Sequence, residues 1–210
     1  MSHRYDEVEA PKRESTSGLA GSPTVQTLVA FLVVFAVQSL VGLVSRGLSL
    51  GLFALAPPIS VRPWTLLVSV YAHAGVGHLV SNAVVLLLVG FAVERATTTW
   101  RFHVFFAGVG MVAGVAQVVV TGALSPGPVP AVLGASGAVF GLLGYLLAGN
   151  RLTDAVLGWL PVRGRTRVAL LLAVAAAATL LTARPGVALI AHFTGFALGL
   201  LAGRVRLLRP

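Results

Sequence analysis

The feature that most constrains this chain is a series of apolar runs long enough to cross a lipid bilayer. A membrane-spanning helix needs about 20 predominantly apolar residues, because the hydrocarbon core is about 30 Å thick. Six such runs, the later ones shorter, lie between residues 24 and 203. Of the 210 residues, 57% are hydrophobic and 10% are charged, whereas soluble domains are about 25% charged. The sequence therefore predicts an all-α membrane protein and excludes an ordinary water-soluble fold.

The runs predict a bundle of six transmembrane helices, at about 24–44, 66–93, 104–122, 135–149, 168–183 and 187–203. They form one membrane domain, residues 24–206, between a polar tail, residues 1–23, and a short cytoplasmic end, residues 207–210. We expect the tail to be disordered and cytoplasmic, because it holds four of the six acidic residues and no apolar core.

Basic residues sort by the side of the membrane. With the tail inside, the cytoplasmic segments hold twelve of the 15 Lys and Arg residues, and the outer segments hold only Arg46, Arg62 and Arg184. This bias follows the positive-inside rule and predicts that both termini are cytoplasmic. It also accounts for the net charge of +9 without a nucleic-acid partner.

Two connections have unusual compositions. Residues 45–63 are long and apolar for a loop, and we expect them to dip into the membrane interface. Residues 121–134 contain three prolines and no charge. Non-helical backbone survives at membrane depth only when it is buried in protein or lines a wet cavity. A short helix that begins near Ser136 is then expected to start at the bottom of such a cavity.

Strongly polar side chains inside membrane segments are functional candidates, because burying them is costly. The candidates are His73, His78, Asn82, Ser136 and His192, and the topology puts all five in the outer half of the bilayer. His78 and Asn82 are four residues apart and share a helix face. His73, five residues before His78, is expected at the rim. The sequence thus predicts one site that opens to the extracellular side.

Glycine spacing predicts which helices bring this site together. Gly137 and Gly141 follow Ser136, and Gly195 and Gly199 follow His192. Small residues four apart let membrane helices approach closely. We therefore expect the fourth and sixth helices to pack together, with the Ser136 hydroxyl within hydrogen-bonding range of His192.

A serine beside a histidine is the minimum for nucleophilic acyl transfer. The two acids outside the tail, Glu94 and Asp154, are expected at cytoplasmic helix ends, so no carboxylate remains to orient the histidine. The residues therefore predict a Ser–His dyad. Ring stacking from Phe140, one turn beyond Ser136, is an alternative means of orienting His192.

The same residues bear on other mechanisms. The sequence has no cysteine, no pair of membrane aspartates and no H-E-x-x-H motif, which argues against cysteine, aspartyl and zinc proteases. Three histidines, His73, His78 and His192, could form a zinc site in principle, but no carboxylate is near them. We therefore expect neither metal nor cofactor.

Four motifs resemble those of the rhomboid family of intramembrane serine proteases. His73–Asn82 is similar to the family's H-x4-H-x3-N, and Gly134–Gly137 to its G-x-S-G. Ala191–Gly199 is similar to A-H-x-x-G-x-x-x-G, and Gly90–Glu94 to G-x-x-x-E. The motifs occur in order and on the expected helices, and the resemblance extends over about residues 24–203.

The resemblance implies that Ser136 is the nucleophile and His192 the general base and acid. His78 and Asn82 would complete an oxyanion hole with the backbone N–H of Ser136 and of Ala135. It also implies cleavage of single-span membrane proteins near the outer ends of their helices, in the cell membrane, without cofactor or metal. The supporting residues are expected to be Phe140, Gly134, Gly137, Gly195 and His73.

The chain departs from the family pattern at two places. Many members have tyrosine where Phe140 stands, which keeps the ring but loses a hydroxyl. The Trp-Arg of the family's first loop is matched only loosely, by Arg62-Pro-Trp64. The connection 45–63 resembles that loop, and residues 168–186 resemble the family's mobile gate and cap.

Two other functions are open on the sequence. A non-catalytic relative would bind transmembrane helices without cutting them, and would be expected to lack the serine or the histidine. A small transporter or channel would distribute ionisable residues across the membrane depth, whereas here the inner half is nearly empty of them.

Overall fold

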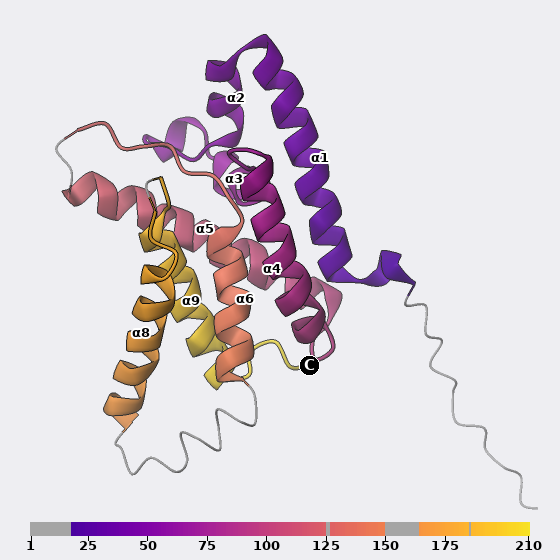
Figure 1. The fold of residues 1–210 in the computed structure, drawn as a ribbon, viewed down its shortest axis with the longest axis vertical. Helices are drawn as coiled ribbons and strands as arrows, with labels where there is room; N and C mark the ends of the chain where they lie inside the picture. Colours follow the sequence, from indigo (N-terminus) through magenta and orange to yellow (C-terminus); the bar gives the residue numbers. More distant parts are fainter. Residues whose placement is uncertain (1–17, 125–126, 150–163, 185) are drawn as a thin grey trace, which may run out of the picture.

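The computed structural model describes residues 18–124, 127–149, 164–184 and 186–210, and every regular element within them is a helix (Figure 1). The longer helices are α1 (Pro23–Val44), α4 (Val76–Glu94), α5 (Thr99–Leu124), α6 (Ser136–Ala148), α8 (Gly164–Leu180) and α9 (Leu189–Arg204). The short ones are α2 (Arg46–Phe53) and α3 (Thr65–Tyr71), with the 3-10 turns η1 (Leu19–Gly21) and η2 (Ile59–Val61).

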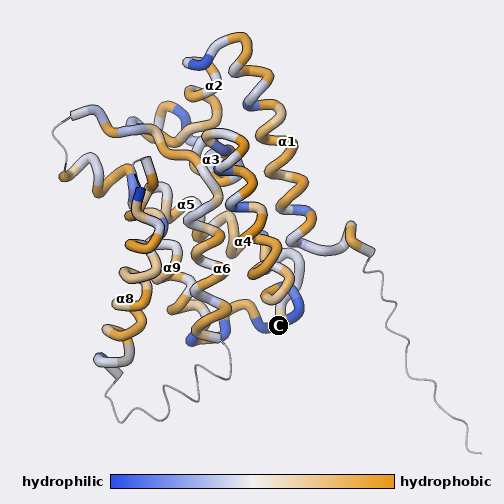
Figure 2. Tube along the Cα trace, viewed as in Figure 1, coloured by the Kyte–Doolittle hydropathy of each residue, from blue (hydrophilic) through white to orange (hydrophobic). Residues whose placement is uncertain are grey.

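The exterior of the helices is hydrophobic. Three of the described helices, α1, α4 and α5, are each long and apolar enough to cross a bilayer, while α6, α9 and residues 168–180 of α8 are shorter apolar helices. Large apolar side chains on α1 such as Leu40, Leu43 and Val44 are exposed, and Figure 2 shows the hydrophobic colour along this helix. An apolar exterior of this kind belongs to a membrane protein.

Helix α6 lies in the middle of the bundle, between α4 and α9 (Figure 1). Its closest neighbour is α9, and the two backbones touch through glycines. A Cβ atom on Gly195 would overlap the carbonyl oxygen of Gly137, and one on Gly199 would overlap that of Gly141. The prediction that these helices pack through small residues is confirmed.

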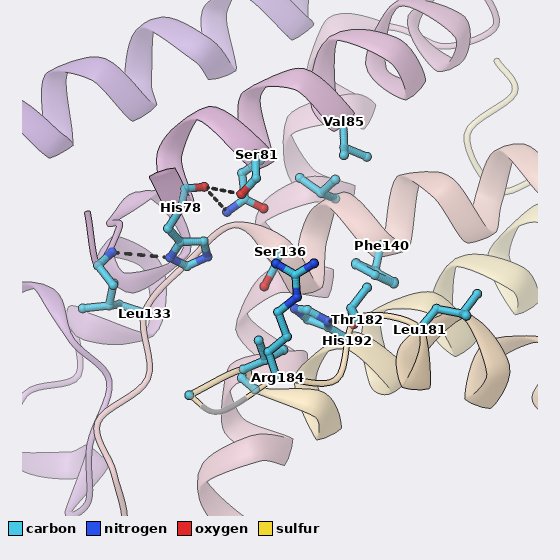
Figure 3. Close-up of a pocket in the computed structure, with 16 residues that line it drawn as sticks. His78, Ser81, Val85, Leu133, Ser136, Phe140, Leu181, Thr182, Arg184 and His192 are labelled. Atoms are coloured by element: carbon cyan, nitrogen blue, oxygen red, sulfur yellow. Dashed lines mark hydrogen bonds between the residues drawn. The ribbon is translucent and has the colours of Figure 1, made fainter. Parts of the chain in front are cut away.

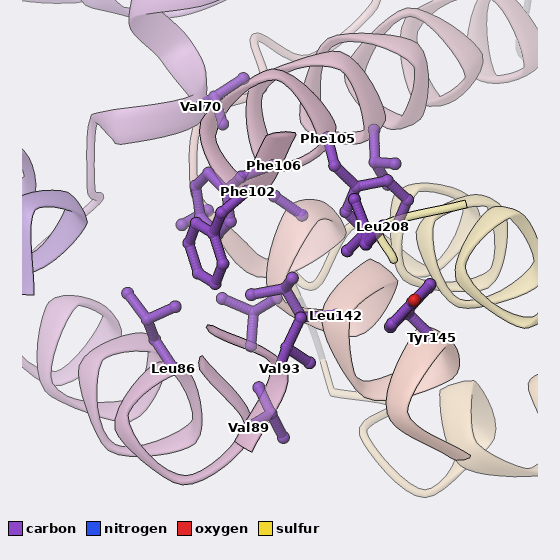
Figure 4. Close-up of a cluster of buried hydrophobic side chains, with 14 of the residues drawn as sticks. Val70, Leu86, Val89, Val93, Phe102, Phe105, Phe106, Leu142, Tyr145 and Leu208 are labelled. Carbon is purple, nitrogen blue, oxygen red and sulfur yellow. The ribbon is translucent and has the colours of Figure 1, made fainter. Parts of the chain in front are cut away.

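A core of aromatic and branched side chains joins α6 to α4 and α5. Phe102 and Phe106 of α5, Leu86 of α4 and Leu142 of α6 are fully buried and lie together (Figure 4). Between membrane helices such side chains stabilise through close van der Waals packing, because lipid tails are as apolar as the side chains themselves. This core holds α4, α5 and α6 together, and α4 and α6 carry three of the five polar candidates.

The expectation of one helix over 66–93 is wrong. Helix α3 ends at Tyr71 and α4 begins at Val76, with extended backbone at Ala72 and Gly75 between them. Gln38 of α1 satisfies the interrupted backbone, since its Nε2 donates to the His73 carbonyl (2.9 Å) and its Oε1 accepts from the His73 N–H (3.1 Å). Three of the four residues in the break are alanine or glycine, so the apolar run continues across it and hydropathy does not reveal the break.

The other helices begin and end close to the predicted residues, with extensions into polar sequence. The helix expected at 104–122 begins at Thr99, and the one expected at 168–183 is Gly164–Leu180. Hydropathy marks an apolar run, whereas a helical backbone continues into polar residues at the interface. The connection 45–63 contains α2, which begins where the Ser45 side chain accepts from the Leu48 N–H (3.2 Å).

The predicted disorder of residues 1–23 is wrong for residues 18–23, while residues 1–17 lie outside the described residues. Ser22 caps α1 by accepting from the Val25 N–H (3.3 Å), and Pro23 occupies the first turn, as helix starts favour. The Ser22 hydroxyl also donates to Glu94 Oε2 (2.8 Å), as does the Thr24 N–H (3.1 Å). Glu94 therefore joins the start of α1 to the end of α4, and Asp154 lies outside the described residues.

Candidate active site

A cavity of about 520 Å³ opens between α4, α6 and the α8–α9 connection. Four of the five polar candidates line it: His78 and Asn82 from α4, Ser136 from α6 and His192 from α9. Figure 3 labels His78, Ser136 and His192 around the cavity. These residues are up to 114 positions apart in sequence, taking His78 and His192 as the ends. The fold thus brings a hydroxyl, two imidazoles and an amide to one cavity.

Ser136 is the first residue of α6, directly after the N-cap residue Ala135. The first N–H groups of a helix have no partner within the helix, and the helix dipole favours negative charge there. The expected hydrogen bond between Ser136 and His192 is not present: the Ser136 hydroxyl has no hydrogen-bond partner among the described residues. Catalytic hydrogen bonds are often long without substrate and tighten when it binds. Ser136 thus presents both an unengaged hydroxyl and a free backbone donor.

His192 lies in the first turn of α9 and is 7% exposed. The Phe140 ring stacks on its imidazole, with ring centroids 4.4 Å apart and an interplanar angle of 16°. Its Nδ1 lies 2.9 Å from the Thr182 hydroxyl. Its Nε2 has no hydrogen-bond partner among the described residues. Stacking on Phe140 is the arrangement that the sequence suggested for orienting this ring.

Two residues that hold His192 were not among the sequence candidates. Thr182 comes from the α8–α9 connection, and Gln117 of α5 accepts from the Ala191 N–H through its Oε1 (3.1 Å), which anchors the first turn of α9. Gln117 could have been found, because it is a strongly polar side chain in an apolar run. Thr182 gives no such signal, since threonine is common at helix ends.

His78 presents its Nε2 edge to the start of α6. Its Nδ1 accepts from the Ala74 N–H (3.4 Å), so the neutral ring carries its proton on Nε2. Gly134 contacts this edge: a Cβ there would lie 2.5 Å from His78 Cε1 and 2.9 Å from Nε2. The backbone at Gly134 has φ +137°, and its N–H donates to the Ser69 carbonyl (2.9 Å). His78 is thus a hydrogen-bond donor beside Ser136.

Asn82 is 5% exposed and faces the same cavity. Its Nδ2 donates to the carbonyl of His78 one turn earlier (3.1 Å). An amide nitrogen has two protons, so one remains for a second acceptor.

The expectation that His73 lies at the rim is wrong. The side chain is fully buried and is not among the residues that line the cavity. Its Nδ1 lies 3.1 Å from the Tyr71 carbonyl, and its ring packs edge-on against His78 at 5.3 Å. Counting 100° per residue from His78 fails because the helix is broken between them. His73 therefore packs against the His78 ring without lining the cavity.

The site offers a nucleophile, a base and donors for a developing negative charge. No cluster of three His, Cys, Asp or Glu side chains that could hold a metal ion occurs in the part of the chain that the structure describes. Glu94 is engaged with Ser22 and Thr24, away from the cavity. This set of groups suits acyl transfer through a serine.

Comparison with known proteins gives a family match and several relatives. A family model described as the rhomboid domain matches residues 60–209. RHOMBOID-like protein 4 of Arabidopsis thaliana is 32% identical over 148 residues, which are 70% of this chain and 35% of that protein. Rhomboid protease GluP of Bacillus subtilis (strain 168) is 39% identical over 84 residues, which are 40% of this chain and 15% of that protein. RHOMBOID-like protein 1 of Arabidopsis thaliana is 29% identical over 148 residues, again 70% of this chain and 35% of that protein. The chain therefore spans about a third or less of the length of these relatives.

Proposed function

Because this chain belongs to the rhomboid family, we propose that it is an intramembrane serine endopeptidase with Ser136 and His192 as its catalytic dyad. The observation that carries the proposal is the shared cavity, in which the Ser136 hydroxyl, the stacked ring of His192 and two further donors converge. The protease name of the relative GluP agrees with this chemistry.

In the proposed reaction, Ser136 Oγ attacks the carbonyl carbon of the scissile peptide bond while His192 Nε2 takes the hydroxyl proton. The carbonyl oxygen becomes an oxyanion and accepts hydrogen bonds from the backbone N–H of Ser136, Nε2–H of His78 and Nδ2–H of Asn82. The C–N bond then breaks, and His192 returns the proton to the leaving amine. Water attacks the acyl-enzyme by the same route and releases Ser136.

The substrates that we propose are single-span membrane proteins. Helices α1, α4 and α5, with the shorter α6, α8 and α9, form six spans with both termini cytoplasmic. The cavity then opens to the outer side of the cell membrane. A substrate helix must unwind before its peptide bond can reach Ser136, because helical backbone groups are engaged in hydrogen bonds. Segments weakened by glycine or proline are therefore preferred.

The proposal is tested with purified protein in liposomes and a generic single-span substrate, with the products identified by mass. The wild type is expected to cut near the outer boundary of the substrate helix, whereas Ser136→Ala and His192→Ala are not. Ser39→Ala is the matched control, because within the described part of the chain this hydroxyl donates only to its own helix, at the Phe35 carbonyl (2.7 Å). Equal cleavage by wild type and Ser136→Ala would contradict the assignment.

A fluorophosphonate probe separates a wrong substrate from a wrong mechanism. If no protein cuts, labelling of the wild type at Ser136 would still indicate a competent nucleophile. Absence of both cleavage and labelling would favour the non-catalytic alternative, a protein that binds transmembrane helices without cutting them.

A further inference from the structure

Thr182 contacts His192, the expected general base, at Nδ1, the ring nitrogen that is not expected to take the serine proton. It lies two residues beyond the end of α8, lines the candidate cavity and is grouped with His192 and Phe140 in Figure 3. Its Oγ1 lies 2.9 Å from His192 Nδ1 and 2.7 Å from the Thr179 carbonyl oxygen. The hydroxyl therefore has two partners, one of which can only accept.

Counting protons fixes the direction of both hydrogen bonds. A hydroxyl has one proton and two lone pairs, and a carbonyl oxygen has no proton. The Thr182 hydroxyl therefore donates to Thr179 and accepts from His192, whose Nδ1 must carry the proton. A neutral imidazole carries only one N–H, so Nε2 of His192 holds a lone pair.

We propose that Thr182 is the positioning residue that holds His192 in the tautomer required of a general base, in place of the carboxylate of a triad. This inference rests on the proposed function. During attack Nε2 gains the serine proton, and Nδ1–H still donates to the same hydroxyl. The contact therefore persists through the reaction, and it strengthens as the ring becomes cationic.

Thr182 and Phe140 restrain different motions of the ring. Stacking on Phe140 at 4.4 Å fixes the plane of the imidazole but allows rotation within that plane. The hydrogen bond at Nδ1 stops this rotation and keeps Nε2 on the opposite side. Neither restraint replaces the other, so loss of Thr182 is expected to matter even though the stack remains.

The experiment compares Thr182→Val, which keeps the shape and loses the hydroxyl, with Thr182→Ser, which keeps the hydroxyl. We expect Thr182→Val to lower kcat about tenfold to hundredfold, as for loss of a hydrogen bond to a charged group, with KM unchanged. Thr182→Ser is expected to retain most of the activity. Thr98→Val is the control, because this buried hydroxyl has no hydrogen-bond partner among the described residues and lies between α4 and α5.

The tautomer is read directly by ¹⁵N NMR of the histidine-labelled protein without substrate, with His192→Gln used to assign the resonances. The wild type is expected to carry the proton on Nδ1, and Thr182→Val to shift it in part to Nε2. A wild-type ring protonated on Nε2 would overturn the inference, even if Thr182→Val failed to fold. Unchanged kcat and tautomer in folded Thr182→Val would overturn it as well.

The two proposals fail in different ways. Absence of cleavage and labelling by the wild type would contradict the proposed protease, whereas the NMR result does not depend on turnover. Cleavage that requires Ser136 but is indifferent to the Thr182 hydroxyl would contradict only the role of Thr182.

Discussion

At Gly134 the backbone has φ +137°, a conformation that residues with a side chain rarely adopt. A Cβ there would also press on the His78 ring, at 2.5 Å from Cε1. We expect Gly134→Ala to lower the free energy of unfolding by about 1–3 kcal/mol and to displace the His78 donor. The readouts are thermal unfolding and the rate of fluorophosphonate labelling.

Gly127→Ala is the control for this substitution. Gly127 lies in the same connection, but an added Cβ would meet no atom of the described residues within 4 Å. It is expected to change neither readout. If Gly134→Ala had the same unfolding temperature and the same labelling rate as the wild type, the proposed role of the Gly134–His78 contact would be contradicted.

The sequence could indicate which residues line the cavity where a polar side chain stands in an apolar run, because such side chains are rare there. Ser136, His192, His78 and Asn82 are polar groups in apolar helices, and the high cost of burying such groups indicated them. Phe140 followed from its place one turn beyond Ser136. Thr182 was not predictable, because its contact with His192 depends on how the α8–α9 connection folds back over the cavity.

Among the elements, α6 and α9 are held together by backbone contact rather than by interlocking side chains. Gly199→Ala would force a methyl group against the Gly141 carbonyl, which belongs to a helix and cannot move alone. We expect it to lower stability by about 1–3 kcal/mol or more and to reduce activity by separating Ser136 from His192. Thermal unfolding and cleavage rate measure the two effects.

The matched variant is Gly108→Ala in α5, where the added Cβ has no atom of the described chain within 4 Å. Replacing glycine by alanine within a helix stabilises by about 0.5–1 kcal/mol when space is available. A similar gain in Gly199→Ala would contradict the close packing of α6 on α9.

Hydropathy and residue spacing predicted the apolar helices and one of their pairings, but not where a helix is interrupted. The pairing of α6 with α9 followed from the glycines at 137, 141, 195 and 199. The break between α3 and α4 did not, because it depends on Gln38 of α1, which is 35 residues from His73 and satisfies its backbone. A contact so distant in sequence leaves no local pattern.

For the whole molecule, the distribution of basic residues predicts opposite sides for the two ends of α9. The chain has no cysteine, so single thiols can report on each side. In intact cells, an impermeant maleimide is expected to label Ala183→Cys and to label Val205→Cys only after permeabilisation. The cysteine-free wild type gives the background. The reverse pattern would contradict the cytoplasmic placement of the termini.

The partner of His192 in this structure, the Thr182 hydroxyl, carries no charge. A carboxylate in place of Thr182 would add a buried negative charge next to His192, and charged groups are costly to bury away from water. With a hydroxyl there, Ser136, His192 and Thr182 are three dipoles between turnovers. In the proposed reaction, an imidazolium and an oxyanion arise together in each tetrahedral intermediate, and both charges disappear when that intermediate collapses.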